Sequence, residues 1–419
     1  SLSDATQQRA VVPDATPFPQ QGNGYLEAND YLAQPQSMNE ADLSAAAPKE
    51  SNGITFEGNV TQFYFGNTSG GLEQEFNYGG HGDYLFNFDL DKLANKQGLF
   101  LKIRAEHRFG ESVNGISGAL LPPTLATDLP TDSENVYITN FVVTQALSEK
   151  FIVFAGKLDA LDGDQNQFAS GRGIRQFSNT ALVASPIALR TIPYSTLGTG
   201  FAILDEGEPM FTFLALNPTD TTRTTGLGEW YSEGVALTSE LRLKTNRGGK
   251  TGHQLFGATW NSREFTSLGQ DPRVILPNVP IATQNGSWSV YWNCDQYLVQ
   301  DQQNPEKGWG YFARAGLADS STNPLSYFLS FGLGGTSPLC CRTDDSFGIG
   351  YFYNGTSDEI GPLLNTALGP ISDGHGGEMF YNFALNKSMT ITPDIQYISP
   401  ARDNVDDALI VGLRMNIAF

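Results

Sequence analysis

Two things that the sequence has little of narrow its class. No apolar run approaches the roughly 20 residues that a membrane-spanning helix needs, so a helical membrane protein is excluded. Basic residues are scarce, with 25 Lys and Arg against 45 Asp and Glu and a formal net charge of -20. Nucleic acid would require basic patches, so we expect no nucleic-acid partner and assign the excess acid to loops in water.

Cysteine and histidine are also rare. Three cysteines are too few for a disulfide framework, and three states stay open: an oxidised Cys340–Cys341 pair, a bridge from one of them to Cys294, or free thiols. The four histidines are dispersed and show no metal-ligand or nucleophile spacing. No signal peptide opens the chain, although an exported protein needs one, so we take Ser1 as a processed or trimmed N-terminus.

The clearest pattern that is present lies in residues 408–419. Because successive strand side chains point to opposite sides, one face there is apolar, with Leu409, Val411, Leu413, Met415, Ile417 and Phe419. The other face is small or polar, with Ala408, Gly412, Arg414, Asn416 and Ala418. Such a strand, ending in an aromatic residue, is typical of a bacterial outer-membrane β-barrel, with lipid outside and water inside. We expect the outer-membrane assembly machinery to recognise this strand, which ends at Phe419.

Period-two segments recur along the chain, and their number is even. They are 54–65, 83–91, 98–109, 135–145, 150–158, 198–205, 209–217, 233–244, 253–263, 287–299, 308–318, 325–334, 346–354, 376–386, 389–398 and 408–419. The 45 Gly, 27 Phe and 16 Tyr suit many short strands with aromatic girdles. The pattern predicts an all-β fold, a 16-stranded antiparallel transmembrane β-barrel over 54–419. Residues 1–53 lack periodicity, and we expect an extension that is periplasmic or docked on the barrel.

A β-sandwich would produce the same alternation, but the connections favour the barrel. Connections after odd-numbered segments are long: 66–82, 110–134, 159–197, 264–286 and 355–375. Connections after even-numbered segments are short: 92–97, 146–149, 206–208 and 387–388. This rhythm predicts short periplasmic turns and long outer loops. The third outer loop, 159–197, holds the position from which trimeric porins fold a loop into the pore.

Four parts of the chain resemble the carbohydrate-selective porins of the OprB type. They are 79–93 (GGHGDYLFNFDLDKL), 154–166 (FAGKLDALDGDQN), 192–201 (IPYSTLGTGF), and 392–400 (TPDIQYISP) with 407–414 (DALIVGLR). The resemblance implies a 16-stranded barrel that passes sugars down their gradient through a constriction rich in arginine and aromatic residues. Residues 1–53 and the Cys340–Cys341 pair lie outside the shared pattern, so neither receives a role from it.

The inward faces of the predicted strands carry eight basic and eight acidic residues. This balance suits a neutral, hydroxyl-rich solute, because an ion-selective pore would show a ring of one sign. The candidate constriction and sugar-binding residues are Arg104, Glu106, Arg172, Arg175, Arg190, Tyr291, Arg314, Asp394 and Arg414. Guanidinium forks can donate to vicinal hydroxyls, and Tyr291 can stack on a pyranose ring. Alternatively, these charges pair across the lumen and hold the loops. We expect Arg104→Ala to widen the pore at little cost in stability.

Other motifs are weak. Asp159, Asp162 and Asp164 offer oxygen ligands at a spacing loosely like that of a calcium loop, but the required glycine and closing glutamate are misplaced, so a solvated turn is the alternative. We expect no other cofactor, and no catalytic residue is assigned.

The predicted function is passive, selective diffusion of neutral mono- or oligosaccharides, with sugars and outer-membrane lipids as partners and a homotrimer as one possible assembly. Two alternatives remain. One is a general diffusion porin that anchors the cell envelope through residues 1–53. The other is an outer-membrane hydrolase that would use His107 on the apolar face with a nearby serine such as Ser112.

Overall fold

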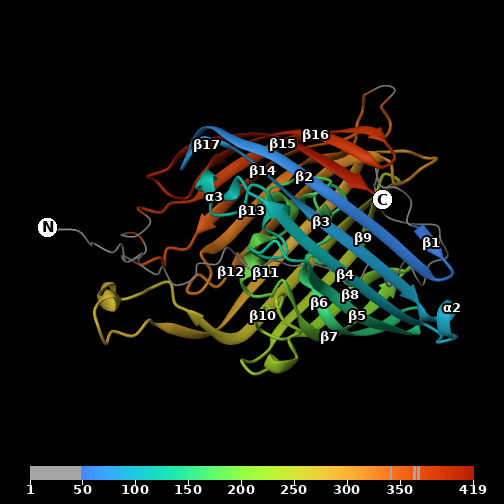
Figure 1. Ribbon diagram of the computed structural model, residues 1–419, viewed down its shortest axis with the longest axis horizontal. Helices are drawn as coiled ribbons and strands as arrows, with labels where there is room; N and C mark the ends of the chain where they lie inside the picture. Colours follow the sequence, from blue (N-terminus) through green and yellow to red (C-terminus); the bar gives the residue numbers. More distant parts are fainter. Residues whose placement is uncertain (1–48, 340–341, 362–364, 366–368) are drawn as a thin grey trace.

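The computed structural model describes residues 49–339, 342–361, 365 and 369–419, which form a closed antiparallel β-barrel (Figure 1). Its sixteen strands are β2 (Ile54–Gly71), β3 (Phe76–Asp89), β4 (Leu99–Gly110), β5 (Tyr137–Ser148), β6 (Phe151–Asp159), β7 (Ser195–Asp205), β8 (Glu208–Leu216), β9 (Ala236–Arg247), β10 (Lys250–Thr266), β11 (Thr283–Gln300), β12 (Gly308–Ala318), β13 (Leu325–Thr336), β14 (Ser346–Thr356), β15 (Gly374–Asn386), β16 (Met389–Ser399) and β17 (Asp406–Ala418). The predicted fold class is confirmed.

Hydrogen bonds close the ring between β17 and β2, where Ala418 lies opposite Asn59 and Ile410 opposite Asn67. Every other barrel strand pairs with its neighbour in sequence. A short strand, β1 (Lys49–Ser51), pairs with the start of β2 and ends the N-terminal extension. The rest of the predicted extension, residues 1–48, lies outside the described residues, as does the Cys340–Cys341 pair.

The alternation in β4 shows why these sequences form barrel strands. Ile103 faces outward beside Phe141 of β5, whose side chain is largely exposed to the surrounding medium. Lys102 and Arg104 face inward and are buried. An apolar outer face meets lipid, and polar inner side chains meet the contents of the barrel.

Of the connections named from the sequence, all but one are found, although 319–324 and 400–405, which also follow odd-numbered segments, are short. The long connections include 111–136, 160–194, 217–235 and 267–282, of which 267–282 extends at the left of Figure 1. The short ones include 149–150, 206–207, 248–249 and 387–388. The expected long connection 66–82 is wrong, because β2 and β3 continue through it and only residues 72–75 join them.

The reason for this error lies in the glycines of β2 and β3. Gly66 and Gly80 occupy outward positions that carry no side chain of their own, so the apolar alternation is lost from the sequence. The ring of Phe76 covers Gly66 and the ring of Phe109 covers Gly80, each so closely that an added Cβ would lie within 2.3 Å of a ring atom. The backbone ladder continues because it needs no side chain, and the neighbouring aromatic rings supply the missing apolar surface.

Short helices interrupt the connections. They are α2 (Leu90–Ala94), α3 (Asn114–Ser117), α4 (Thr180–Val183), η1 (Leu125–Asp128), η2 (Ala160–Asp162), η3 (Gly171–Gly173), η4 (Pro186–Arg190), η5 (Leu227–Glu229) and η6 (Pro272–Ile275). None of the helices in the described part of the chain has the length and apolarity to cross a membrane.

Candidate functional site in the barrel lumen

The connection between β6 and β7, residues 160–194, folds into the barrel as the sequence predicts, and we call it the inward loop. Its apolar side packs against inward-facing residues of β12 to β15. The buried residues of this contact are Phe168, Phe177, Leu182 and Ile187 from the loop and Phe312, Phe328, Phe352 and Phe380 from the wall. Phe177 meets Phe312 and Phe380 edge to face, with ring centroids 5.3 and 5.0 Å apart. The loop therefore closes off one side of the lumen.

The opposite side of the inward loop is held by ion pairs. Arg172 of η3 places Nη2 2.6 Å from Glu106 and 3.1 Å from Asp159. Arg104 contacts Asp159 at 3.1 Å and Asp83 at 3.2 Å. These five side chains, which we call the charge cluster, are each at most 9% exposed.

Two further groups complete the charge cluster. The Tyr194 hydroxyl donates to Glu106 at 2.5 Å, and His81 lies 3.3 Å from the same carboxylate. Burial, and then the charges of Asp159 and Glu106, raise the pKa of the Tyr194 phenol well above its ordinary value. Burial alone would lower the pKa of Arg172, but the same two carboxylates raise it well above its ordinary value. The guanidinium of Arg172 is therefore a fixed positive charge in the lumen.

Arg314 and Arg414 hold the same loop from the wall of the barrel. Arg314 contacts Asp164 at 2.9 Å and donates to the carbonyls of Leu182 and Ala169 at 2.9 and 2.7 Å. Arg414 donates to the carbonyls of Gly173 and Gln176 at 3.0 and 2.7 Å. Both arginines are 0% exposed. Their expected contact with a passing solute is therefore corrected: both side chains are fully buried, and their Nη atoms donate to the loop backbone.

Asp394 belongs to a third attachment. It accepts from the Ser178 hydroxyl at 3.2 Å, and its neighbour Glu378 accepts from the backbone amides of Ser178 and Asn179 at 2.6 and 2.8 Å. Asp394 is 3% exposed, so the expectation that it lines the open pore is also wrong.

Tyr291 is placed by a glycine on the neighbouring strand. Its ring lies over Gly257 of β10, where an added Cβ would fall 2.1 Å from a ring atom. Its hydroxyl donates to Glu240 at 2.6 Å, and the side chain is 4% exposed. Neither face of the ring is open to a pyranose, so the predicted stacking role is corrected.

Arg104 and Glu106 are also buried, and the structure favours the alternative that mid-barrel charges pair to hold the loop. Because Asp83 and Asp159 depend on that guanidinium, we now expect Arg104→Ala to destabilise the inward loop, in place of the low cost expected from the sequence. Arg175 and Arg190 differ, since both are only half-buried. Arg175 donates to Asn59 at 3.3 Å, and these two loop arginines remain predicted contacts for a solute.

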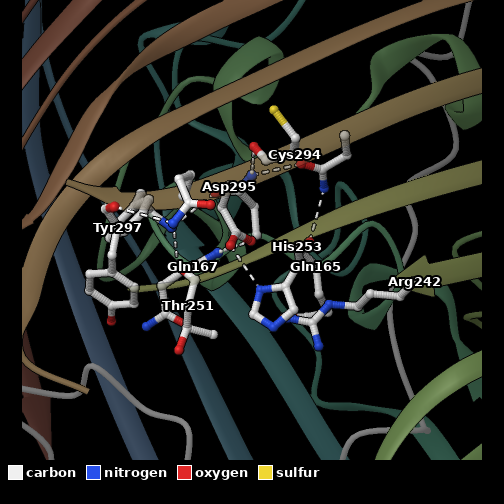
Figure 2. A network of polar contacts seen from close by, with 12 residues as sticks. Gln165, Gln167, Arg242, Thr251, His253, Cys294, Asp295 and Tyr297 are labelled. Carbon is white, nitrogen blue, oxygen red and sulfur yellow. Dashed lines mark hydrogen bonds and ion pairs between the residues drawn. The ribbon is translucent and has the colours of Figure 1, made fainter. Parts of the chain in front are cut away.

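A polar network that sequence reasoning missed lies on the wall of β9 to β11 (Figure 2). His253 Nδ1 contacts Oδ1 of Asp295 at 2.8 Å. The other carboxylate oxygen of Asp295 accepts a hydrogen bond from the backbone N–H of Gln167 in the inward loop at 3.2 Å. Arg242 pairs with Glu208 at 2.8 Å. His253 and Asp295 are direct cross-strand partners, so only the β10–β11 register would have revealed the pair.

Two of the three aspartates of the candidate calcium site, Asp159 and Asp164, are held in different ion pairs. Asp159 pairs with Arg104 and Arg172, whereas Asp164 pairs with Arg314, and Asp162 lies between them in η2.

Among the described residues, one group of three offers metal-ligand atoms within 4.8 Å of one another: His81, Asp83 and Glu106. Two guanidinium groups already neutralise these carboxylates, and a cation would have to displace them.

Cys294 is a buried free thiol in the described part of the chain. The pairing that a hydrolase would need is absent between the two residues considered. The Ser112 hydroxyl bonds to Thr127 at 2.7 Å, and His107 stacks on Tyr84 with centroids 5.8 Å apart.

Comparison with known proteins supports the assignment of this barrel as a porin. The sequence profile described as carbohydrate-selective porin, OprB family, matches residues 73–419. Comparison with curated protein sequences finds no match.

Three solved structures share the fold. The high-pH structure of Pseudomonas putida OprB is 18% identical, with a TM-score of 0.75 over 88% of this chain and 94% of that one. Its low-pH structure is 13% identical, with a TM-score of 0.54 over 88% and 93%. The channel DcaP of Acinetobacter baumannii is 11% identical, with a TM-score of 0.51 over 88% and 99%. From the family match, the chain belongs to the OprB family of carbohydrate-selective porins and forms a passive carbohydrate channel in the bacterial outer membrane.

Proposed function

We propose that this channel selects neutral mono- or oligosaccharides, and that the inward loop sets the selectivity. The observation that carries the proposal is the pairing of charges within the charge cluster, where each of the carboxylates of Asp83, Glu106 and Asp159 lies at ion-pair distance from Arg104 or Arg172. A wall whose charges are paired attracts neither cations nor anions strongly. It still presents polar atoms to which sugar hydroxyls can bond.

The half-buried Arg175 and Arg190 are the loop residues that we assign to direct contact with the sugar. Both project from the inward loop, and a guanidinium offers five donors in a fixed plane, which matches two adjacent hydroxyls. The buried arginines are positioning residues in this proposal. They fix the loop and hence the width of the passage.

Liposome swelling with purified protein tests the selectivity. Glucose is expected to enter faster than gluconate, a sugar acid of similar size. Equal rates would contradict the proposed selectivity but would not contradict the assignment as a channel. Planar-bilayer recordings separate a selective channel from a general diffusion pore. Block of the ion current by glucose should saturate if the sugar binds, and should rise linearly with concentration if it only fills the pore.

We also propose partners for the outer surface. Lipid is expected to contact the apolar outward residues, and the assembly machinery to bind the strand that ends at Phe419. That residue exchanges backbone hydrogen bonds with Gly58, at 3.1 and 2.9 Å. A homotrimer remains a prediction, which the molar mass of the protein in detergent would test.

A further inference from the structure

Two arginines lie against the same buried aromatic ring near one end of the barrel. The guanidinium carbon of Arg263 is 4.2 Å from the centroid of Phe265, and that of Arg190 is 5.3 Å from it. Arg190 is the last residue of η4 in the inward loop, whereas Arg263 and Phe265 lie within the last four residues of strand β10. The two charges are therefore no further apart than the sum of those distances, and loop and wall bring them together.

Neither charge is paired with an adjacent carboxylate. In the described part of the chain, neither guanidinium forms an ion pair with a carboxylate. Arg190 donates from Nε to the carbonyl of Thr322 at 3.1 Å, and the Nε of Arg263 is buried without a hydrogen-bond partner. Glu233 acts on Arg263 only from beyond ion-pair distance. By contrast, Arg242 on the neighbouring strand pairs with Glu208 at 2.8 Å.

The pair is costly to the protein as it stands. Burial lowers the pKa of Arg190 to about 10, and the charge of Arg263 acts in the same direction. Arg190 still carries its charge at neutral pH. Two like charges in a partly desolvated place repel each other, and an anion between them would relieve this repulsion. The chain carries a formal net charge of -20, so acidic residues outnumber basic ones. An excess of basic residues therefore does not explain why two arginines lie together without a carboxylate partner.

The position of the pair is at the outer mouth. β10 ends at Thr266 and is followed by the long connection 267–282, which lies on the same side as the other long loops. Thr322 also lies in a connection on that side, between β12 and β13. Both arginines are half-buried, so part of each side chain stays accessible to a solute.

We propose that Arg190 and Arg263 form an anion-binding station at the outer mouth, which takes the carboxylate of a sugar acid. The planar fork of each guanidinium matches a carboxylate, and Phe265 fixes the position of both forks. A neutral sugar can accept hydrogen bonds from the same donors, but it carries no charge to offset those of the two guanidinium groups. The charge cluster holds three carboxylates against two guanidinium groups, so it offers the anion no second station to move to. Sugar acids are therefore held at the mouth and obstruct the passage of neutral sugars.

This inference rests on the proposed function as a sugar channel. The experiment is single-channel recording of the full chain in planar bilayers, with gluconate added to the outer side and glucose measured in parallel. Wild-type protein is expected to show saturable block by gluconate. Arg263→Gln is expected to weaken the apparent affinity for gluconate at least about tenfold, which is the loss of one charge-assisted contact, and to leave block by glucose unchanged. Arg190→Gln should also weaken gluconate block and provides a second variant if the first does not fold; because Arg190 is also assigned to sugar contact, glucose block is compared only between wild type and Arg263→Gln.

The matched control is Arg242→Gln, which removes the same charge from a compensated position. It should leave the affinity for gluconate within about twofold of wild type, because any long-range effect of lumen charge is screened over about 10 Å at 0.1 M salt. Equal weakening by Arg242→Gln and Arg263→Gln would overturn the station and indicate general electrostatics. Unchanged gluconate block in Arg263→Gln would also overturn it. Loss of glucose block in wild-type protein would instead refute the proposed function.

Discussion

Replacing Arg172 by Gln is the most direct test of how the inward loop is held. The substitution removes the contacts of its guanidinium with Glu106 at 2.6 Å and Asp159 at 3.1 Å, and its bond to the Tyr194 hydroxyl at 2.8 Å. Three buried carboxylates would then share Arg104 as their remaining guanidinium partner within the charge cluster. Removing one partner of a buried ion pair typically costs about 3–5 kcal/mol, because the other charge stays buried and uncompensated.

This free-energy penalty is expected to destabilise the docked position of the inward loop and not the barrel. Arg314 and Arg414 hold other parts of the loop from β12 and β17, and the backbone ladder of the barrel does not involve Arg172. A penalty of about 3–5 kcal/mol lowers the ratio of closed to open loop by roughly two to more than three orders of magnitude. The variant should therefore conduct ions more, with noisier open-channel current, and should discriminate less between glucose and gluconate.

The assay is single-channel conductance in potassium chloride together with liposome swelling. Arg273→Gln is the control, since Arg273 pairs with Asp271 in an exposed loop and its side chain is 74% exposed. It should behave as wild type, because exposed ion pairs contribute about 0–1 kcal/mol. Adding Glu106→Gln to Arg172→Gln should restore part of the discrimination, because it removes one of the uncompensated carboxylates. Wild-type conductance and selectivity in Arg172→Gln would refute the role assigned to the charge cluster.

Three further predictions concern the wall, a glycine contact and assembly. Ile103→Arg should lower the free energy of unfolding by about 2–4 kcal/mol in denaturant titrations, because an arginine would face lipid, while Ile103→Val should cost less than about 1.5 kcal/mol; a silent Ile103→Arg would invert the assignment of faces on β4. Gly257→Val should displace the Tyr291 ring, break its bond to Glu240 and reduce conductance, whereas Gly257→Val with Tyr291→Ala should recover it; unchanged conductance in the single variant would argue against a rigid contact. Phe419→Ala should reduce the amount of barrel in the outer membrane of cells but not the yield of refolding in detergent, and an equal loss in both measurements would assign Phe419 to stability alone.

Much of the fold follows from local pattern. The alternation in 408–419 and in 98–109 identifies strands β17 and β4. One face of each strand contacts lipid and is apolar, and the other faces the polar contents of the barrel. The pattern fails at 66–82, where glycines remove the signal and aromatic rings from neighbouring strands restore the surface. Because these rings belong to neighbouring strands, the sequence of β2 alone does not show that its glycine positions are covered by apolar groups.

The lumen is less predictable for a related reason. The alternation identifies Arg314 and Arg414 as inward-facing, and both do face inward. Whether an inward arginine meets water or the inward loop depends on the packing of residues far away in sequence. The contact of Arg314 with the Leu182 carbonyl joins positions 132 residues apart, and that of Arg414 with the Gly173 carbonyl joins positions 241 apart. The station at Arg190 and Arg263 depends on the same packing of loop against wall.

The pairing of β2 with β17 has a consequence for how the protein reaches its folded state. This seam joins residues that are very far apart along the chain, as in the 2.7 Å bond from Asn416 to Thr61, which spans 355 positions. Contacts of such long range form slowly, because a large loop entropy is lost before any of their bonding is gained. Until the seam forms, β2 and β17 each present an open row of backbone donors and acceptors, and such edges readily join other chains. An intermediate that has made every hairpin but not the seam is therefore the species most prone to aggregate, and a periplasmic chaperone that shields these two edges would raise the yield of closed barrels more than one that binds any inner hairpin.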